Sequence, residues 1–73
     1  VFIDISDKFY KISWIKTSVK KNNLNSKDFV SWYSMTNKYE DFAETFTYYI
    51  LHNKEFSEKT KTSITLKQKY DFF

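Results

Sequence analysis

Apolar residues recur with helical spacing from Asn37 to about Leu51, which is the clearest element of the sequence. Asn37 is a favourable N-cap residue, and Glu40 follows three residues later in the capping-box position. With a turn of about 100° per residue, the apolar positions of this segment fall on one broad helix face. They are Tyr39, Phe42, Ala43, Phe46 and Ile50. The pattern predicts an amphipathic helix whose apolar face holds it against the rest of the domain.

Two carboxylates, Glu40 and Glu44, share a second stripe of this helix with Thr47 and Leu51, about a quarter turn from the apolar face. Local structure alone explains Glu40 as a capping-box residue and Glu44 as part of a solvated face. Two features disagree with that interpretation. The stripe ends in Leu51, and the preceding segment FVSWYSMTN is rich in aromatic residues for a surface connection. Local structure therefore leaves the role of the two carboxylates open.

The first half of the chain predicts shorter elements. Ile5, Phe9 and Ile12 fit a short helix, and the KISWI segment that follows has extended character. Residues 17–28 are polar, contain three asparagines and predict a loop. The FVSWY segment at 29–33 is short and β-prone, so we expect an extended piece there.

The C-terminal part predicts two more helices, one at 54–61 and one from Ser63 to Phe73. Together with the two helices before them, they indicate a mostly α fold of three to four short helices. Residues 1–73 are enough for a single small domain or a fragment of a larger one. The chain begins at Val1 rather than at methionine, within the apolar run VFIDI, which we interpret as an internal cut.

The composition excludes several kinds of site. Cysteine is absent and His52 is the single histidine, so this chain supplies neither a thiolate metal site nor two imidazole ligands. We expect His52 to end the long helix, where the dipole favours an imidazole. All twelve basic residues are lysine, which argues against sequence-specific nucleic-acid binding. No apolar run approaches the ~20 residues of a membrane span. Glycine is also absent, so a turn that needs positive φ must use an asparagine.

The segment YSMTNKYEDFAETF at 33–46 resembles the C-terminal half of gluzincin-type zinc metallopeptidases, in particular the lethal factor-like bacterial peptidases. In that family a His-Glu-x-x-His helix gives two zinc ligands and the general base. A later helix gives a glutamate as third ligand, and a tyrosine that faces the reacting carbonyl precedes it by seven residues. The pattern Y-x-x-T-N-x-x-E-x-F-A-E-x-F carries the resemblance, which is firm over residues 31–51 and thinner on either side.

The resemblance implies a role for three residues and a zinc cofactor. Glu40 matches the third zinc ligand. Glu44 matches the carboxylate that hydrogen-bonds a ligand imidazole without binding the zinc itself, and Tyr33 matches the tyrosine that donates to the transition state. Catalytic zinc takes three protein ligands and leaves a place for water. A supporting carboxylate orients a ligand imidazole, and a phenol can donate to the developing oxyanion. The implied activity is hydrolysis of peptide bonds in a peptide or protein substrate, and the implied fold is the C-terminal subdomain of a zincin-like domain.

The sequence departs from the family because it contains no His-Glu-x-x-His. His52 does not replace that motif, since it lies twelve residues beyond Glu40, roughly 18 Å along a continuous helix. This chain alone is therefore expected neither to hold zinc tightly nor to cleave peptides. Three explanations remain open: a piece of a larger peptidase whose remainder carries the histidine helix, a non-catalytic descendant, or a non-enzymatic helical domain that binds another protein.

Overall fold

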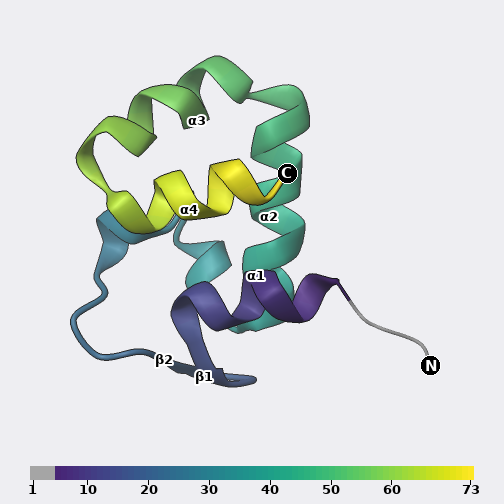
Figure 1. The fold of residues 1–73 in the computed structure, drawn as a ribbon, viewed down its shortest axis with the longest axis vertical. Coiled ribbons are helices and arrows are strands. Elements are labelled where there is room, and N and C mark those ends of the chain that lie inside the picture. Colours follow the sequence, from purple (N-terminus) through teal and green to yellow (C-terminus); the bar gives the residue numbers. More distant parts are fainter. Residues whose placement is uncertain (1–4) are drawn as a thin grey trace.

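The computed structural model describes residues 5–73, which form four α-helices, three short 3₁₀ helices and one two-stranded sheet (Figure 1). In chain order the elements are α1 (Ser6–Ser13), β1 (Trp14–Lys16), β2 (Val19–Lys20), η1 (Ser26–Asp28), η2 (Tyr33–Met35), α2 (Lys38–Leu51), α3 (Asn53–Lys59), η3 (Thr60–Thr62) and α4 (Ile64–Phe72). The prediction of a mostly α fold with three to four short helices is confirmed. The apolar start of the chain, residues 1–4, lies outside the described part.

Helix α2 has the bounds that its sequence predicts. The side-chain oxygen of Asn37 accepts hydrogen bonds from the amides of Tyr39 and Glu40, at 3.0 and 2.9 Å, and so caps the first turn. The contacts of residues 5–73 do not include the reciprocal capping-box bond from the Glu40 carboxylate. His52 ends the helix, as expected, and its amide donates to the carbonyl of Tyr48. Asn37 therefore caps α2 without help from Glu40.

The expected extended segment KISWI is extended only at its end, because its first three residues complete α1 and only Trp14 and Ile15 belong to β1. Strand β1 pairs antiparallel with β2 so that Trp14 lies opposite Lys20. Residues 17–28, expected as a loop, contain β2 and η1 between turns. Asn23 has a φ of 73°, and it is the one non-glycine residue with positive φ in the described range. This confirms that asparagine takes the left-handed position in a chain without glycine.

The prediction of an extended piece at FVSWY is wrong, because this segment bends and leads into η2. Two serines make the bend. The Ser34 amide donates to Ser31 Oγ at 3.1 Å, and Ser34 Oγ donates to the Ser31 carbonyl at 2.7 Å. Such local side-chain bonds compete with strand pairing. The bulky character of the segment serves burial instead, since Phe29 and Val30 are each only 3% exposed.

The two C-terminal helices are present near their predicted positions. Helix α3 begins at Asn53, directly after His52, the residue at which α2 ends. After η3 the chain turns at Ser63, whose hydroxyl accepts from the amide of Leu66 at 3.1 Å and caps α4.

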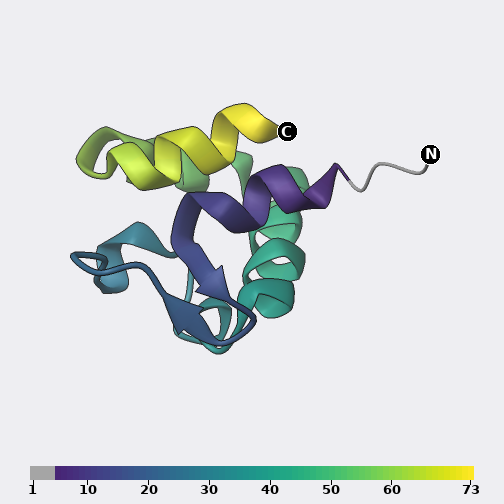
Figure 2. The same ribbon diagram turned by 60° about the horizontal axis from the view of Figure 1, so that its bottom comes forward.

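The core lies where α1 and α4 cross α2 (Figure 1). Phe9 of α1 is fully buried there, with its ring centroid 5.2 Å from that of Phe42 and 5.6 Å from that of Phe72. Both edge-to-face contacts are of the kind that stabilises aromatic cores. In Figures 1 and 2, α1 lies between α4 and the small sheet. A second cluster of Val30, Phe56 and Leu66 joins the FVSWY bend to α3 and α4. None of the helices in residues 5–73 has the length and apolar character needed to cross a membrane.

Helix α2 turns polar residues toward this interior. Asp41 and Thr45 are fully buried, whereas Tyr39, Phe46 and Ile50 are 55, 47 and 58% exposed. Within the described chain, the predicted apolar face is therefore divided. Its Phe42 edge packs into the aromatic core. Tyr39 and Phe46 are partly exposed although their rings contact Tyr10 and Phe73, and Ile50 is mostly exposed.

Candidate functional site

The two candidate carboxylates lie on α2 beside the element that carries the candidate tyrosine. Glu40 and Glu44 are both half-buried, one helical turn apart. Ser31 Oγ donates a hydrogen bond to the Glu44 carboxylate at 3.0 Å. The contacts of the described chain include no hydrogen bond or ion pair to the Glu40 carboxylate. Glu44 is thus held by the FVSWY bend, and Glu40 remains available to a ligand.

Tyr33 is the first residue of η2, which packs closely along α2. Its side chain is 59% exposed, so the phenol is accessible. The Ser31–Ser34 bend described above fixes the backbone that leads into Tyr33, and the same Ser31 hydroxyl reaches Glu44. One bend therefore positions the start of η2 and the Glu44 carboxylate together.

A buried ion pair lies on the inward side of α2. Lys69 Nζ lies 2.9 Å from Asp41 Oδ2, and both side chains are fully buried. Asp41 also accepts from the indole N–H of Trp14 at 2.9 Å and from the Thr45 hydroxyl at 3.0 Å. A buried carboxylate is tolerated when its oxygens are satisfied in this way. The Asp41 carboxylate therefore has its hydrogen-bonding capacity occupied, unlike that of its neighbour Glu40.

Lys69 also reaches η1. Its ammonium donates to the carbonyl of Asp28 at 3.1 Å and lies 3.9 Å from the ring centroid of Phe29. The Asp28 carboxylate in turn accepts from the Ser63 hydroxyl at 2.6 Å. Burial lowers the pKa of Lys69 from 10.5, and the nearby Asp41 and Asp28 carboxylates oppose that shift. The ammonium thus joins α4, α2 and η1 at one point in the interior.

This network was not predicted from the sequence, although one signal for it exists. Lys69 falls between Leu66 and Tyr70 on the α4 side that faces the core, where a surface lysine is out of place. Structurally, the network fixes the rotation of α2 about its axis. With Asp41 held inward, Glu40 points about 100° away from it around the helix, toward the outer surface.

The described residues do not by themselves complete a metal site. No group of three or more His, Cys, Asp or Glu side chains in residues 5–73 is arranged to hold a metal ion. His52 is exposed at the far end of α2, where its ring lies against Tyr48 at a centroid distance of 5.3 Å. Of the candidate ligands, Glu40 fits best, because it is half-buried and its carboxylate has no partner in the described part of the chain. Residues 5–73 are therefore compatible with one ligand of a zinc ion, and they do not form a complete zinc site.

A mostly helical chain that presents two carboxylates on α2 and an accessible tyrosine on the adjacent η2 is compatible with part of a metallohydrolase. A family model described as "Putative zinc-binding metallo-peptidase" matches residues 1–71, and the chain belongs to this family. The match includes residues 1–28, over which the motif resemblance was only slight. It confirms the prediction of a zinc metallopeptidase at the level of the family. Neither a curated protein nor a solved structure matches the chain.

Proposed function

We propose that this chain is the C-terminal part of the catalytic domain of a gluzincin-type zinc metallopeptidase, similar to the lethal factor-like bacterial peptidases. Glu40 is the third zinc ligand, and Tyr33 is the transition-state donor. Glu44 accepts a hydrogen bond from a zinc-bound imidazole and so holds it in place. One observation carries the assignment: Glu40 is a half-buried carboxylate without a partner among residues 5–73, while its neighbours Asp41 and Glu44 are both held by the protein.

The chain's own residues suit these roles. Bound zinc would polarise a water molecule and lower its pKa. The Ser31 bond keeps one oxygen of Glu44 in place, so that the carboxylate can accept the free N–H of an imidazole and fix its orientation. The exposed phenol of Tyr33 can donate a hydrogen bond to the oxyanion of a peptide carbonyl under attack. The substrate is a peptide or protein, and no specific nucleic acid is involved.

The partner of this chain is the remainder of the peptidase domain, which carries the His-Glu-x-x-His helix. The outward side of α2, which carries Glu40 near its start and Ile50 and Leu51 at its end, supports this proposal. Ile50 and Leu51 are 58 and 69% exposed on the side of α2 that turns away from its own core, and Phe46 is also open. Apolar patches of this kind mark interaction surfaces. Docking of the histidine helix here would cover the apolar residues and bring two imidazoles toward Glu40. The alternative, a non-enzymatic helical domain, would use the same surface to bind another protein.

Zinc content distinguishes the two functions. In the full-length protein that contains this chain, Glu40→Ala should sharply reduce both the zinc bound per molecule and peptide hydrolysis. Glu55→Ala is the matched control, because Glu55 is an exposed glutamate on α3. It should leave zinc content and hydrolysis unchanged. An unchanged zinc stoichiometry in Glu40→Ala would remove Glu40 from the ligand set. Absence of zinc and of peptide hydrolysis from the natural full-length protein would favour the non-enzymatic alternative.

A further inference from the structure

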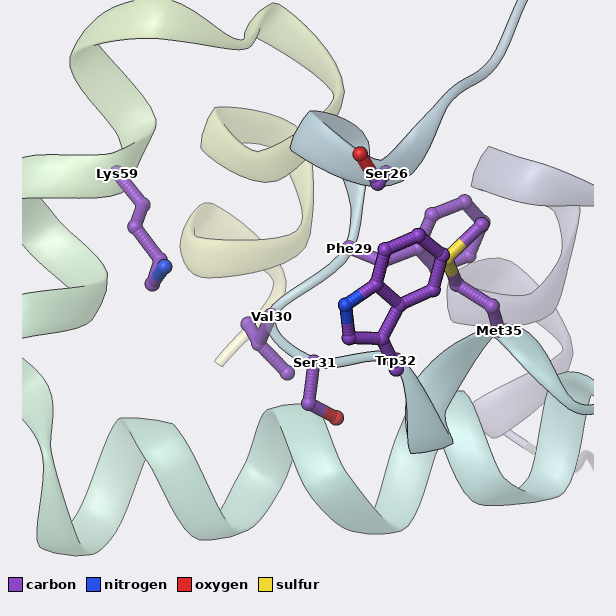
Figure 3. Close-up of a pocket in the computed structure, with 7 residues that line it drawn as sticks. All are labelled: Ser26, Phe29, Val30, Ser31, Trp32, Met35 and Lys59. Atoms are coloured by element: carbon purple, nitrogen blue, oxygen red, sulfur yellow. The ribbon is translucent and has the colours of Figure 1, made fainter.

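A groove of about 260 Å³ opens beside the candidate catalytic residues, between η1, η2 and α3 (Figure 3). Four lining residues belong to the FVSWY bend: Phe29, Val30, Ser31 and Trp32. The others are Ser26 of η1, Met35 of η2 and Lys59 of α3. Trp32 and Lys59 stand on opposite sides, and Val30 and Ser31 lie between them (Figure 3).

One side of the groove is apolar and unusually accessible. Trp32 is 79% exposed, whereas the other tryptophan, Trp14, is only 4% exposed in the core. Phe29 and Val30 form a firm floor, since each is almost completely buried. Exposed tryptophan on a rigid base is characteristic of binding surfaces, because it offers a large contact area with little conformational freedom to lose. This side fits a bulky apolar side chain.

The other side of the groove is positively charged. Lys59 is half-buried, and the ion pairs of residues 5–73 join other lysines, Lys61, Lys67 and Lys69, to their acidic partners. No aspartate or glutamate lines the groove. The Lys59 ammonium therefore has no protein carboxylate to balance it within the described chain. A ligand with a carboxylate next to its apolar group complements this arrangement.

The groove adjoins the proposed catalytic residues through Ser31 and Trp32. Ser31 belongs to its lining, and the same hydroxyl holds Glu44 at 3.0 Å. Trp32 directly precedes Tyr33 in η2. A peptide whose scissile carbonyl faces Tyr33 would therefore extend along this bend, and one of its neighbouring side chains would enter the groove.

We infer that the groove is a substrate subsite for an acidic peptide, in which Trp32 packs on a bulky apolar side chain and Lys59 pairs with the carboxylate of an adjacent internal aspartate or glutamate. This inference rests on the proposed function, which it extends to the choice of substrate. It names Trp32 and Lys59 as specificity-determining residues.

A double-mutant cycle on the full-length protein tests the inference. The probe is a fluorescein-labelled hexapeptide with capped ends, in which phenylalanine is followed by glutamate in an alanine background, and binding is measured by fluorescence anisotropy in EDTA. Replacing the peptide glutamate with glutamine should weaken binding about fivefold to the natural protein. The same replacement should change binding to Lys59→Gln by less than about twofold.

Two further variants complete the experiment. Lys54→Gln carries the same change of charge on the same helix, outside the groove, and should keep the preference for glutamate. Trp32→Ala should weaken the binding of both peptides by about tenfold. Because Trp32 is mostly exposed, the circular dichroism spectrum of the Trp32→Ala variant should match that of the natural protein.

Three outcomes would overturn the subsite. The first is that replacing glutamate with glutamine in the peptide weakens binding equally to the natural protein and to Lys59→Gln. The others are unaltered peptide binding by Trp32→Ala, and binding only of peptides that have a free C-terminal carboxylate. Since EDTA removes zinc, these results do not depend on the metal site. The proposed function fails separately, through the zinc content of Glu40→Ala.

Discussion

Lys69 of α4 and Asp41 of α2 are joined across the interior by a 2.9 Å ion pair, although they lie far apart in the sequence. Lys67 and Asp71, which flank Lys69 on α4, form a shorter pair of 2.7 Å at the surface. The two pairs differ in burial more than in distance. The interior pair has no water to replace a lost partner, so we expect it to matter far more for stability.

Lys69→Met should lower the free energy of unfolding by about 3–5 kcal/mol, because it leaves the Asp41 charge buried with only neutral donors. Lys67→Met, on the same helix, should cost less than about 1 kcal/mol. The double variant Asp41→Asn/Lys69→Met should recover most of the loss, since the asparagine oxygen can accept from Trp14 and its NH₂ group can donate to the Thr45 hydroxyl. Urea denaturation followed by circular dichroism measures all three, and equal stability of the two single variants would contradict the prediction.

The same pair predicts how stability depends on alkaline pH. Burial lowers the folded-state pKa of Lys69, whereas the unfolded lysine stays protonated up to about 10.5. Between these two values the unfolded chain binds more protons, so the free energy of unfolding should rise with pH, by at most about 1.4 kcal/mol per pH unit. Asp41 and Asp28 oppose the shift and narrow this window.

Denaturation from neutral pH to 10.5 tests this sign, with Asp41→Asn/Lys69→Met as the reference. The difference between the natural protein and the reference isolates Lys69, because the other lysines and the tyrosines are common to both. If this difference in the free energy of unfolding falls with rising pH, the two carboxylates raise the pKa of Lys69 by more than burial lowers it.

The predictable part of the fold is the part that local chemistry determines. Helix α2 follows from the Asn37 cap and a 3.6-residue period, and both features act within a few residues. The FVSWY segment was misjudged because bulky residues favour strands in general, while two serine hydroxyls decide the bend. Strand propensity is an average over many environments, whereas these hydrogen bonds depend on the two serines of this particular segment.

The candidate site divides in the same way. The motif resemblance identified Tyr33, Glu40 and Glu44 as candidates, and their roles remain predictions. The resemblance did not extend to Ser31, whose hydroxyl holds Glu44 from another segment. Asp41 gave no signal beside Glu40, because an aspartate in the first turn of a helix is ordinarily explained by the helix dipole. Its burial depends on Lys69 arriving from α4, which is a tertiary effect.

Tyr33→Phe should separate catalysis from metal binding in the full-length protein. Removing the hydroxyl should lower the turnover number by roughly 100-fold, as expected for the loss of one oxyanion donor, and leave the zinc stoichiometry unchanged. Tyr39→Phe is the control, since Tyr39 is similarly exposed on α2 and packs against Tyr10. Full activity in Tyr33→Phe would remove this residue from the mechanism.

The exposed apolar face of α2 gives the most direct test of the proposed docking of the histidine helix. Ile50 and Ile64 are both exposed isoleucines, at 58 and 78%, but only Ile50 lies on the face of α2 proposed to meet the histidine helix. In the full-length protein, Ile50→Gln should lower the free energy of unfolding by about 2 kcal/mol, because the side chain is covered there. Ile64→Gln should change it by less than about 0.5 kcal/mol, as at an ordinary surface position. Equal and small effects would mean that Ile50 faces solvent in the complete protein, and that the histidine helix does not dock on this face.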